Sequence, residues 1–419
     1  MQKVLKNAVV REAFGDVVQL GLAGVVRRGL RELVFDEGMG RLYEILEEER
    51  AAVCGPRHAQ GPQRRGRRMG HAPGELVLGG RLVQVRRPRA RTLDGQEVIL
   101  PSWAAFRARD PLSERAVEQM LVGVATRKYE RSLEPVAPGL RTRGTSKSAV
   151  SRRFVAATGA SIAAWQRRDL GAIDLLVLMI DGLHVDDHVI LVALGIDTDG
   201  KKHVLGLREG ATESSTSCKA LLADLESRGL RTDGPILAVI DGSKALAKAI
   251  GAVFGDRAAI QRCQAHKVRN VEDQLPEAMR SSVRHTMREA YRCRNVERAR
   301  RILTNLARRL RDDHPGAAAS LEEGLDETLT VMSFGLPEWL ERTLSTTNAI
   351  ENLVGSVRDV GARVKRWRNG RMIVRWTGTA LIEASKHFRR VRDHRGLKIL
   401  AAALNKRLQQ DVAPVALQA

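Results

Sequence analysis

The chain contains 419 residues, 43% of them hydrophobic, a length and composition that predict roughly two or three domains with packed cores. Its formal net charge of +21 favours a polyanionic partner, DNA or RNA. No apolar stretch reaches the ~18 residues that cross a bilayer, and the charged N-terminus is unlike a signal peptide, so we expect no membrane partner. Four cysteines without disulfide-like spacing indicate a reducing compartment, and we expect a cytoplasmic, nucleoid-associated protein.

The first 110 residues contain segments of different kinds. Residues 1–54 have helical periodicity, and residues 55–110 are predicted to form a basic linker and a small β unit. Residues 55–72 are rich in Gly, Pro and Arg and predict a flexible arm, whereas the GG and DG signals within residues 75–100 predict a hairpin. Residues 55–110 hold 12 Arg or Lys against 4 Asp or Glu, a net of +8. That imbalance favours phosphate contact, with simple solubilisation as the alternative.

Residues 111–170 are predicted to form a helical DNA-binding region. The segment GTSKSAVSRRFVAATG opens with a Ser/Thr capping signal and carries Lys147, Arg152 and Arg153. A helix, a loop and a short basic helix are compatible with a helix-turn-helix, and an ordinary helical hairpin is the alternative.

Residues 171–263 have the patterns of strands and short helices. Three consecutive apolar runs are separated by turns at Asp186–Asp187 and Asp199–Gly200, and a helix, a strand, a helix and a strand follow. The order β-β-β-α-β-α-β predicts an α/β core of ribonuclease-H-like type. Residues 264–342 have helical periodicity almost throughout, and residues 343–419 are also helical and basic. We therefore expect this α/β core to follow a mainly helical N-terminal DNA-binding region.

Three carboxylates lie in separate settings that share one chemical implication. Asp181 interrupts the apolar run DLLVLMIDGLHV, Asp241 ends the run PILAVIDG, and Glu351 lies within the helical pattern STTNAIENLVGSVRDV. A charge in an apolar strand is unfavourable unless it is paired or binds a cation. In the predicted strand order the first strand is central and the fourth lies beside it, so the two aspartates would meet at one edge. A helix packed on the sheet would add the glutamate.

Oxygen-donor side chains of this kind predict a site for Mg²⁺, with Mn²⁺ as a substitute. Two such ions would activate an attacking oxygen and stabilise the leaving oxygen of a phosphodiester, without a side-chain nucleophile. Thr347, Gly355 and Arg358 share the helical face of Glu351, and small and basic neighbours would admit a DNA backbone. The alternative is a surface glutamate paired with Arg358.

Cys263 and His266 form a CxxH pair directly after the last predicted strand. As a zinc site the pair is incomplete, because no second pair of ligands lies nearby in sequence. A buried thiol with a hydrogen-bonded histidine is one interpretation, and a histidine that orients a carboxylate or phosphate is the other. Trp367, in KRWRNGR, either belongs to the core or stacks on an unpaired base.

Four motifs carry a family resemblance. GLREGATES, VIDGSKALAKAI, QRCQAHKVRNV and TTNAIEN, with the spacings between them, strongly resemble the bacterial Mutator-type insertion-sequence transposases, from about residue 110 to 390. The resemblance implies a ribonuclease-H-like catalytic domain in which Asp181, Asp241 and Glu351 are the catalytic, metal-binding triad. It also implies an all-α insertion between the last strand and the Glu351 helix, and a site-supporting role for Cys263 and His266.

The match is less close in three places. The first motif reads IDGLHVDD, where similar proteins often have DA followed by a basic residue, and it ends in Asp186 and Asp187. The Arg-rich run and FPN-like element that follow the glutamate in the family fit Arg363, Arg366 and Asn369 only approximately. The first 100 residues match poorly, so end-recognition contacts there are not defined by the resemblance.

The predicted function is a Mg²⁺-dependent DNA transposase that binds the terminal inverted repeats of an insertion sequence and also binds target DNA. It would cleave and transfer strands as a homodimer or larger assembly. The alternatives are a ribonuclease-H-like nuclease or resolvase, and a DNA-binding regulator with a decayed catalytic domain. The residues expected to support the site are Cys263, His266, Arg358 and Asn348, and those expected to contact DNA are Lys147, Arg152, Arg153, Arg363, Lys365, Arg366 and Trp367.

Overall fold

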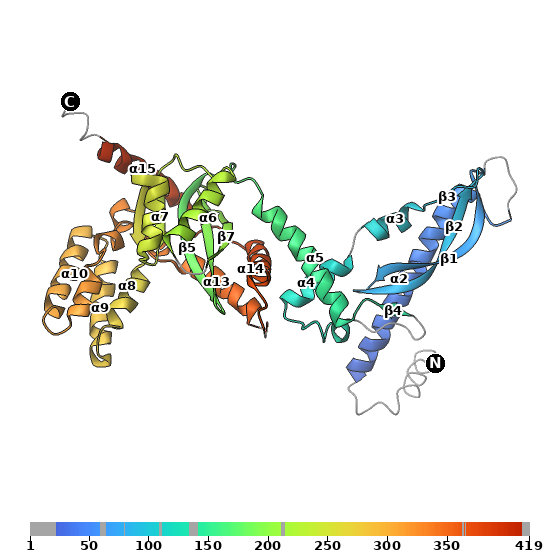
Figure 1. Cartoon of the computed structure of the whole chain (residues 1–419), viewed down its shortest axis with the longest axis horizontal. Coiled ribbons are helices and arrows are strands. Elements are labelled where there is room, and N and C mark those ends of the chain that lie inside the picture. The colour runs from blue at the N-terminus through green and yellow to red at the C-terminus, as the bar shows by residue number, and fades with distance from the viewer. Residues whose placement is uncertain are drawn as a thin grey trace, which may run out of the picture. The chain divides into compact units, whose positions relative to one another are not determined.

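The chain divides into two compact units, Met1–Thr158 and Gly159–Ala419, and the division falls within helix α5 (Lys147–Gln166). The computed structural model describes residues 22–58, 64–78, 80–108, 111–133, 141–210, 214–362, 364 and 366–412 (Figure 1). Among these described residues, no helix is both long enough and apolar enough to cross a membrane.

The N-terminal unit combines a long helix with a four-stranded antiparallel sheet. Apolar side chains of the helix, including Leu42 and Leu46, pack against Val83 and Val85 of the sheet and against Trp103. Strand β2 is central, because β1, β3 and β4 all pair with it. The elements are α2 (Leu22–Cys54), β1 (Gly66–Leu78), β2 (Arg81–Thr92), β3 (Glu97–Val98), α3 (Pro101–Ala108), α4 (Pro111–Leu121), η1 (Glu130–Ser132) and β4 (Thr142–Arg143).

The predicted flexible arm at residues 55–72 is wrong from Gly66 onward, because β1 begins there. Gly66 pairs with Thr92, and a Cβ at this glycine would lie 2.5 Å from the Arg91 carbonyl oxygen, so glycine permits the close approach of the strands. An irregularity between Arg68 and His71 lets the Gly- and Pro-containing segment continue as one strand. Residues 59–63 of the predicted arm lie outside the described residues.

The helix-turn-helix prediction for residues 111–170 is also wrong. Residues 122–146 separate α4 from α5, whereas a helix-turn-helix joins its helices through a turn of about three or four residues. This connection also contributes β4, in which Thr142 and Arg143 pair with Val83 and Leu82 of β2. The alternative of an ordinary helical hairpin fails for the same reason.

The C-terminal unit contains a five-stranded mixed sheet of order β7-β6-β5-β8-β9. The element order agrees with the order predicted from the sequence, and the tight turns at Asp186–Asp187 and Asp199–Gly200 connect the first three strands. β5 is central and is antiparallel to β6 and parallel to β8. The elements are β5 (Leu175–Val185), β6 (His188–Asp197), β7 (Lys202–Gly210), α6 (Ser215–Ser227), β8 (Ile236–Ile240), α7 (Lys244–Phe254), η2 (Gly255–Arg257) and β9 (Ala258–Arg262).

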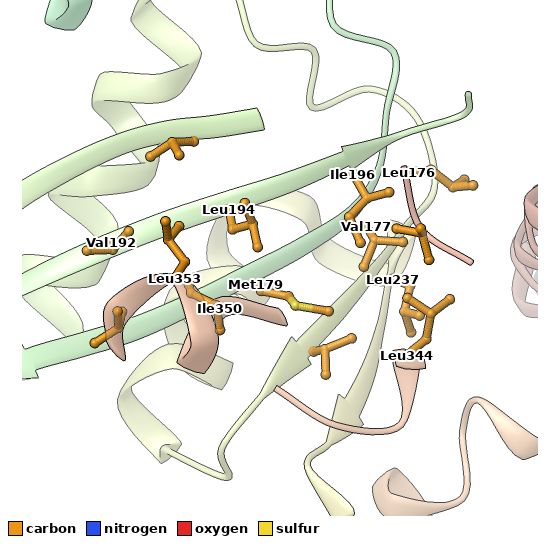
Figure 2. Close-up of a cluster of buried hydrophobic side chains, with 14 of the residues drawn as sticks. Leu176, Val177, Met179, Val192, Leu194, Ile196, Leu237, Leu344, Ile350 and Leu353 are labelled. Atoms are coloured by element: carbon orange, nitrogen blue, oxygen red, sulfur yellow. The ribbon is translucent and has the colours of Figure 1, made fainter. Parts of the chain in front are cut away.

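Alternating residues of β5 face two different hydrophobic clusters. Leu178 and Ile180 pack with α6 and α7 on one face, whereas Val177, Met179 and Leu183 pack with the C-terminal helices on the other. Figure 2 shows part of this second cluster, in which helical residues Ile350 and Leu353 lie beside strand residues such as Met179 and Val192. The alternation places residue 181 on the same face as Met179 and Leu183.

Helices occupy the chain between β9 and the Glu351 helix, and they have a hydrophobic core of their own. This segment is joined to the sheet by buried polar groups: the Gln261 side-chain amide donates to the Thr328 carbonyl oxygen at 2.9 Å and accepts from the Val331 amide at 2.8 Å. The elements are α8 (Gln264–Glu272), α9 (Glu277–Arg292), α10 (Val296–Leu310), α11 (Pro315–Glu322), η3 (Asp326–Thr328), η4 (Met332–Phe334) and α12 (Glu338–Leu344). The chain then continues through α13 (Asn348–Gly361), α14 (Gly370–Ser385), η5 (His394–Gly396) and α15 (Leu397–Val412).

Candidate active site

The register of two parallel strands brings Asp181 and Asp241 to neighbouring positions. Val177 of β5 pairs with Leu237 of β8, and Met179 pairs with Val239. Continued by two residues, this register sets Asp241 opposite Asp181, on strands that lie about 4.8 Å apart. Asp241 directly follows the end of β8, and Asp181 lies within β5 at the level of that end, so the parallel pairing brings both aspartates together.

Each aspartate is oriented by a backbone amide close to it in sequence. The Gly182 amide donates to Asp181 Oδ1 at 2.8 Å, and the Ser243 amide donates to Asp241 Oδ1 at 2.9 Å. Ser243 is also the N-cap of α7, since its hydroxyl accepts from the Leu246 amide. In each case one carboxylate oxygen is held by the backbone. The sequence interpretation did not assign Ser243 a role, although its position in IDGSKAL is a recognisable capping signal.

Helix α13 adds Glu351 to the same face of the sheet. Its buried stripe packs on the β5 side that bears Met179 and Leu183, and Glu351 lies beside that stripe and is half-buried. The stripe consists of Ile350, Leu353, Val354 and Val357. The Thr347 hydroxyl, one turn earlier and buried, donates a hydrogen bond to Glu351 Oε1. Glu351 contacts Thr347 and His266, whereas Arg358 is exposed. The described residues therefore do not show the alternative ion pair between Glu351 and Arg358.

The three carboxylates are close enough to influence one another electrostatically. Burial raises the pKa of Asp181, and the negative charges of Asp241 and Glu351 raise this pKa further. The Gly182 amide and the positive charge that His266 carries when protonated act in the opposite direction. Clustered carboxylates that repel one another in a half-buried site are stabilised by a cation, so this arrangement favours metal binding.

Cys263 connects three parts of the chain at the edge of this site. Its amide donates to the Ile240 carbonyl oxygen at 2.7 Å, directly before Asp241. Its Sγ accepts from the amides of His266 at 3.5 Å and Thr347 at 3.4 Å. The thiol is fully buried, so its role is to fix the end of β8, the start of α8 and the start of α13 relative to one another.

His266 lies between this thiol and Glu351. Its Nδ1 is 3.3 Å from the Thr347 hydroxyl and 3.7 Å from Glu351 Oε1. Contact with the Cys263 side chain raises the pKa of His266, and the charges of Glu351 and Asp241 raise it further. Burial alone would raise the pKa of the Cys263 thiol, but the hydrogen bonds from His266 and Thr347 outweigh burial and lower it. The buried thiol and the hydrogen-bonded histidine agree with the first interpretation of the CxxH pair, and the position of His266 beside Glu351 is compatible with the second.

These contacts also define which residues could hold a metal ion. Ligand atoms of Cys263, His266 and Glu351 lie within 4.8 Å of one another. A cation held by the carboxylates would therefore have the CxxH pair beside it. Hard cations such as Mg²⁺ prefer oxygen ligands, so the chemistry of the carboxylates suits them better than a thiol does.

The other predicted site residues have different surroundings. Asn348 and Arg358 are exposed on α13, and Arg366 is exposed after it. Trp367 is half-buried and packs against the core. Arg363 and Lys365 lie outside the described residues.

The basic residues predicted on α5 belong to the N-terminal unit. Lys147 and Arg152 are exposed, as expected of DNA contacts. The Arg153 guanidinium instead donates to the Gly144 carbonyl oxygen at 2.6 Å and so supports the start of the helix.

A basic chain with carboxylates gathered at the edge of a mixed sheet is typical of enzymes that act on nucleic-acid phosphodiesters. Comparison with known proteins identifies the family: the profile of the Mutator family of transposases matches residues 31–391, and the chain belongs to this family. It is similar to the transposase for insertion sequence element ISRM5 of Rhizobium meliloti, with 27% identity over 90% of this chain and 94% of that protein.

Two further relatives show how the similarity is distributed. The transposase for IST2 of Acidithiobacillus ferrooxidans is 33% identical over 42% of this chain and 58% of its own length. The transposase for IS256 in transposon Tn4001 of Staphylococcus aureus is 23% identical over 89% of this chain and 93% of its own length. The family and these relatives define DNA transposition as the function of this chain.

Proposed function

We propose that this protein is an active transposase whose Asp181, Asp241 and Glu351 form a Mg²⁺-dependent catalytic triad. The sheet order, with a central first strand and a parallel fourth strand beside it, supports a ribonuclease-H-like core. The observation that carries the proposal is the convergence of three carboxylates from β5, β8 and α13 on one face. The helices between β9 and α13 would then be an insertion into that core.

The residues present fit a divalent cation. Three carboxylates supply oxygen ligands, and burial, together with the negative charges of Asp241 and Glu351, raises the pKa of Asp181. Mg²⁺ would bind Asp181, Asp241 and Glu351, with Mn²⁺ able to substitute. When bound, the metal supplies Lewis-acid stabilisation of charge on the phosphate and its entering and leaving oxygens.

The protein itself contributes by holding the carboxylates in fixed positions. Backbone amides hold one oxygen of each aspartate, and Thr347 and His266 hold Glu351, so the carboxylates meet the phosphate in a fixed arrangement. A water oxygen attacks a phosphorus atom at the transposon end, the bond to the 3′ oxygen breaks, and a 3′-OH is released. That 3′-OH then attacks a target phosphodiester, so one P–O bond forms as another breaks and no nucleotide cofactor is required.

The N-terminal unit is proposed to bind the terminal inverted repeats. Its exposed cations include Lys147 and Arg152 on α5, and residues 55–110 have a net charge of +8. Arg363, Lys365 and Arg366 would contact DNA near the catalytic face. Because two transposon ends must be held together for transposition, we propose a homodimer or larger assembly acting on nucleoid DNA in the cytoplasm.

The test is cleavage of a duplex that carries the inverted repeat flanking the coding region. Asp181→Asn, Asp241→Asn and Glu351→Gln should each abolish cleavage with Mg²⁺ or Mn²⁺ while leaving binding to the end intact. Near-wild-type cleavage by any one variant removes that residue from the triad. Two further assays distinguish the alternative functions. A nuclease or resolvase would cut the duplex but would not join pre-cut ends to target DNA. A regulator with a decayed catalytic domain would bind the duplex without cutting it.

A further inference from the structure

We propose that a pocket beside the three carboxylates receives one unpaired nucleobase from the DNA end during cleavage. This inference rests on the proposed function and names a binding site that the triad does not include. The pocket has a volume of about 230 Å³ and lies between the end of β5, the end of α13 and the middle of α14. Residues that the argument uses are His184, Val185, Arg358, Gly361, Trp367 and Trp376, and they define the end-base pocket.

The end-base pocket lies on the elements that carry the catalytic carboxylates. Val185 follows Asp181 by four residues on the same strand and the same face, a separation of about 13 Å. Arg358 follows Glu351 by seven residues on α13, a rise of about 10 Å. Successive bases in a stacked strand are about 3.4 Å apart, so the pocket lies roughly three or four nucleotides from the scissile phosphate.

Among the described residues, the lining combines the Trp367 and Trp376 rings with the Arg358 guanidinium. Trp367 is half-buried and Trp376 is 9% exposed, so the walls offer indole surface that is largely shielded from water. The Trp367 ring borders the last residue of α13, since a Cβ built on Gly361 would lie 3.6 Å from its Cζ2 atom. The exposed Arg358 guanidinium makes no ion pair within the described part of the chain.

These features fit a nucleobase better than a wholly apolar ligand. Bases stack on indole rings irrespective of sequence, and an adjacent arginine can neutralise the phosphate of the same nucleotide. The exposed His184 and Asp186 at the pocket offer hydrogen-bonding groups to a base edge. A DNA strand that is bound at the carboxylates also passes within reach of this pocket. A partner protein would have no such reason to place a side chain there.

Base capture would have a consequence for the reaction. Withdrawing one base opens the duplex within a few nucleotides of the scissile phosphate, and the stacking energy gained in the pocket offsets the energy of unpairing. Loss of one stacked base corresponds to a rate reduction of about 5- to 150-fold at 25 °C. The pocket would therefore act on cleavage of paired ends more strongly than on overall DNA affinity, which the phosphate contacts supply.

Photocrosslinking tests the location directly. The probe is a duplex of the inverted repeat in which 5-iodouracil replaces, one position at a time, each base within four nucleotides of the cleavage site. It is bound to the full-length Asp241→Asn protein, irradiated, and the crosslinked peptide is mapped. We expect one position to crosslink to the peptide with Trp367 or Trp376. If every crosslink maps to other peptides, the proposal that the end-base pocket binds a base is refuted.

A substitution that fills the pocket provides the functional test. Gly361→Met should remove the crosslink and slow cleavage of paired ends by about 5- to 150-fold, as should Trp367→Ala. An abasic site at the crosslinked position should restore the rate, because no base then needs to be withdrawn. The matched control is Gly251→Met, an exposed glycine of α7 whose added Cβ would meet nothing within 4 Å, and it should cleave like wild type.

The outcomes separate the two proposals. Normal cleavage by Gly361→Met, or a defect that an abasic site relieves at no position, overturns the end-base pocket and leaves the triad standing. A wild-type protein that fails to bind or cut the inverted repeat overturns the proposed function, and the pocket falls with it. Thermal unfolding of Gly361→Met and Trp367→Ala identifies a loss of folding, and Gly361→Met tests the pocket without removing a core contact.

Discussion

Replacement of Thr347 by valine tests whether Glu351 must be oriented by its neighbours. Thr347 is 1% exposed, and its hydroxyl contacts both Glu351 Oε1 and, at 3.3 Å, His266 Nδ1. Valine has nearly the same shape but no hydroxyl, so Thr347→Val removes this bridge while leaving the backbone contact with Cys263 in place. Glu351 would then sample orientations that do not suit a shared cation.

The size of the effect follows from one charged hydrogen bond. Such a bond contributes about 1.5–3 kcal/mol, and residues that orient metal ligands typically change activity or metal affinity by about 10- to 100-fold. These ranges agree, since tenfold corresponds to about 1.4 kcal/mol. We therefore expect Thr347→Val to cleave the inverted-repeat duplex about 10- to 100-fold more slowly, or to require correspondingly more Mg²⁺. The assay is single-turnover cleavage across a Mg²⁺ titration.

The matched control is Thr379→Val on α14. Thr379 is also buried, but its hydroxyl donates to the Arg375 carbonyl oxygen at 2.7 Å, and within the described ranges it has no hydrogen bond to a carboxylate. This control should keep the wild-type rate and Mg²⁺ dependence. If Thr347→Val cleaves within threefold of wild type at every Mg²⁺ concentration, the orienting role of Thr347 is refuted.

Three further predictions concern stability and DNA binding. Leu353→Ala removes a buried contact between α13 and the sheet and should lower the free energy of unfolding by about 2–5 kcal/mol in urea titrations. A hydrogen bond from Arg89 helps lower the pKa of Glu97 to about 2 from 4.5, so its stabilisation is present above pH 4.5 and is lost as the pH falls toward 2. Glu97→Gln should therefore lose that part of the acid dependence of unfolding, and an unchanged pH profile contradicts the argument. Lys147→Ala with Arg152→Ala should weaken DNA binding and reduce the slope of log affinity against log salt by about one per phosphate contact, whereas an unchanged slope excludes them from contact.

The strand arrangement was predictable because its signals are local and mutually consistent. The separation of 60 residues between Asp181 and Asp241 equals the offset of the observed pairing, in which Val177 lies opposite Leu237. Alternation along β5 also indicates which face each residue occupies. Once the first strand is central and the fourth lies beside it, parallel pairing brings the two aspartates together.

The N-terminal errors arose where local composition conflicted with tertiary pairing. Glycine, proline and arginine in residues 55–72 favour a flexible arm, yet Gly66–Leu78 forms a strand because β2 supplies its hydrogen-bonding partner. The helical patterns of α4 and α5 were recognisable. Their sequence did not reveal that the long connection between them contributes a strand to the hairpin sheet.

The sequence by itself determined the order of strands and helices in residues 171–263 and singled out the three carboxylates, because these depend on periodicity, residue type and spacing. Its motifs indicated the family through their resemblance to known transposases. Only the tertiary structure decided that Thr347 bridges Glu351 and His266, and that the buried Cys263 thiol fixes the ends of three segments. It also brought Trp367, which packs against the core, and the exposed Arg358 to one pocket. The physical reason is that such contacts join residues far apart in the chain. They form only when α13 is packed on the sheet, and no local pattern specifies the rotation and position of that helix.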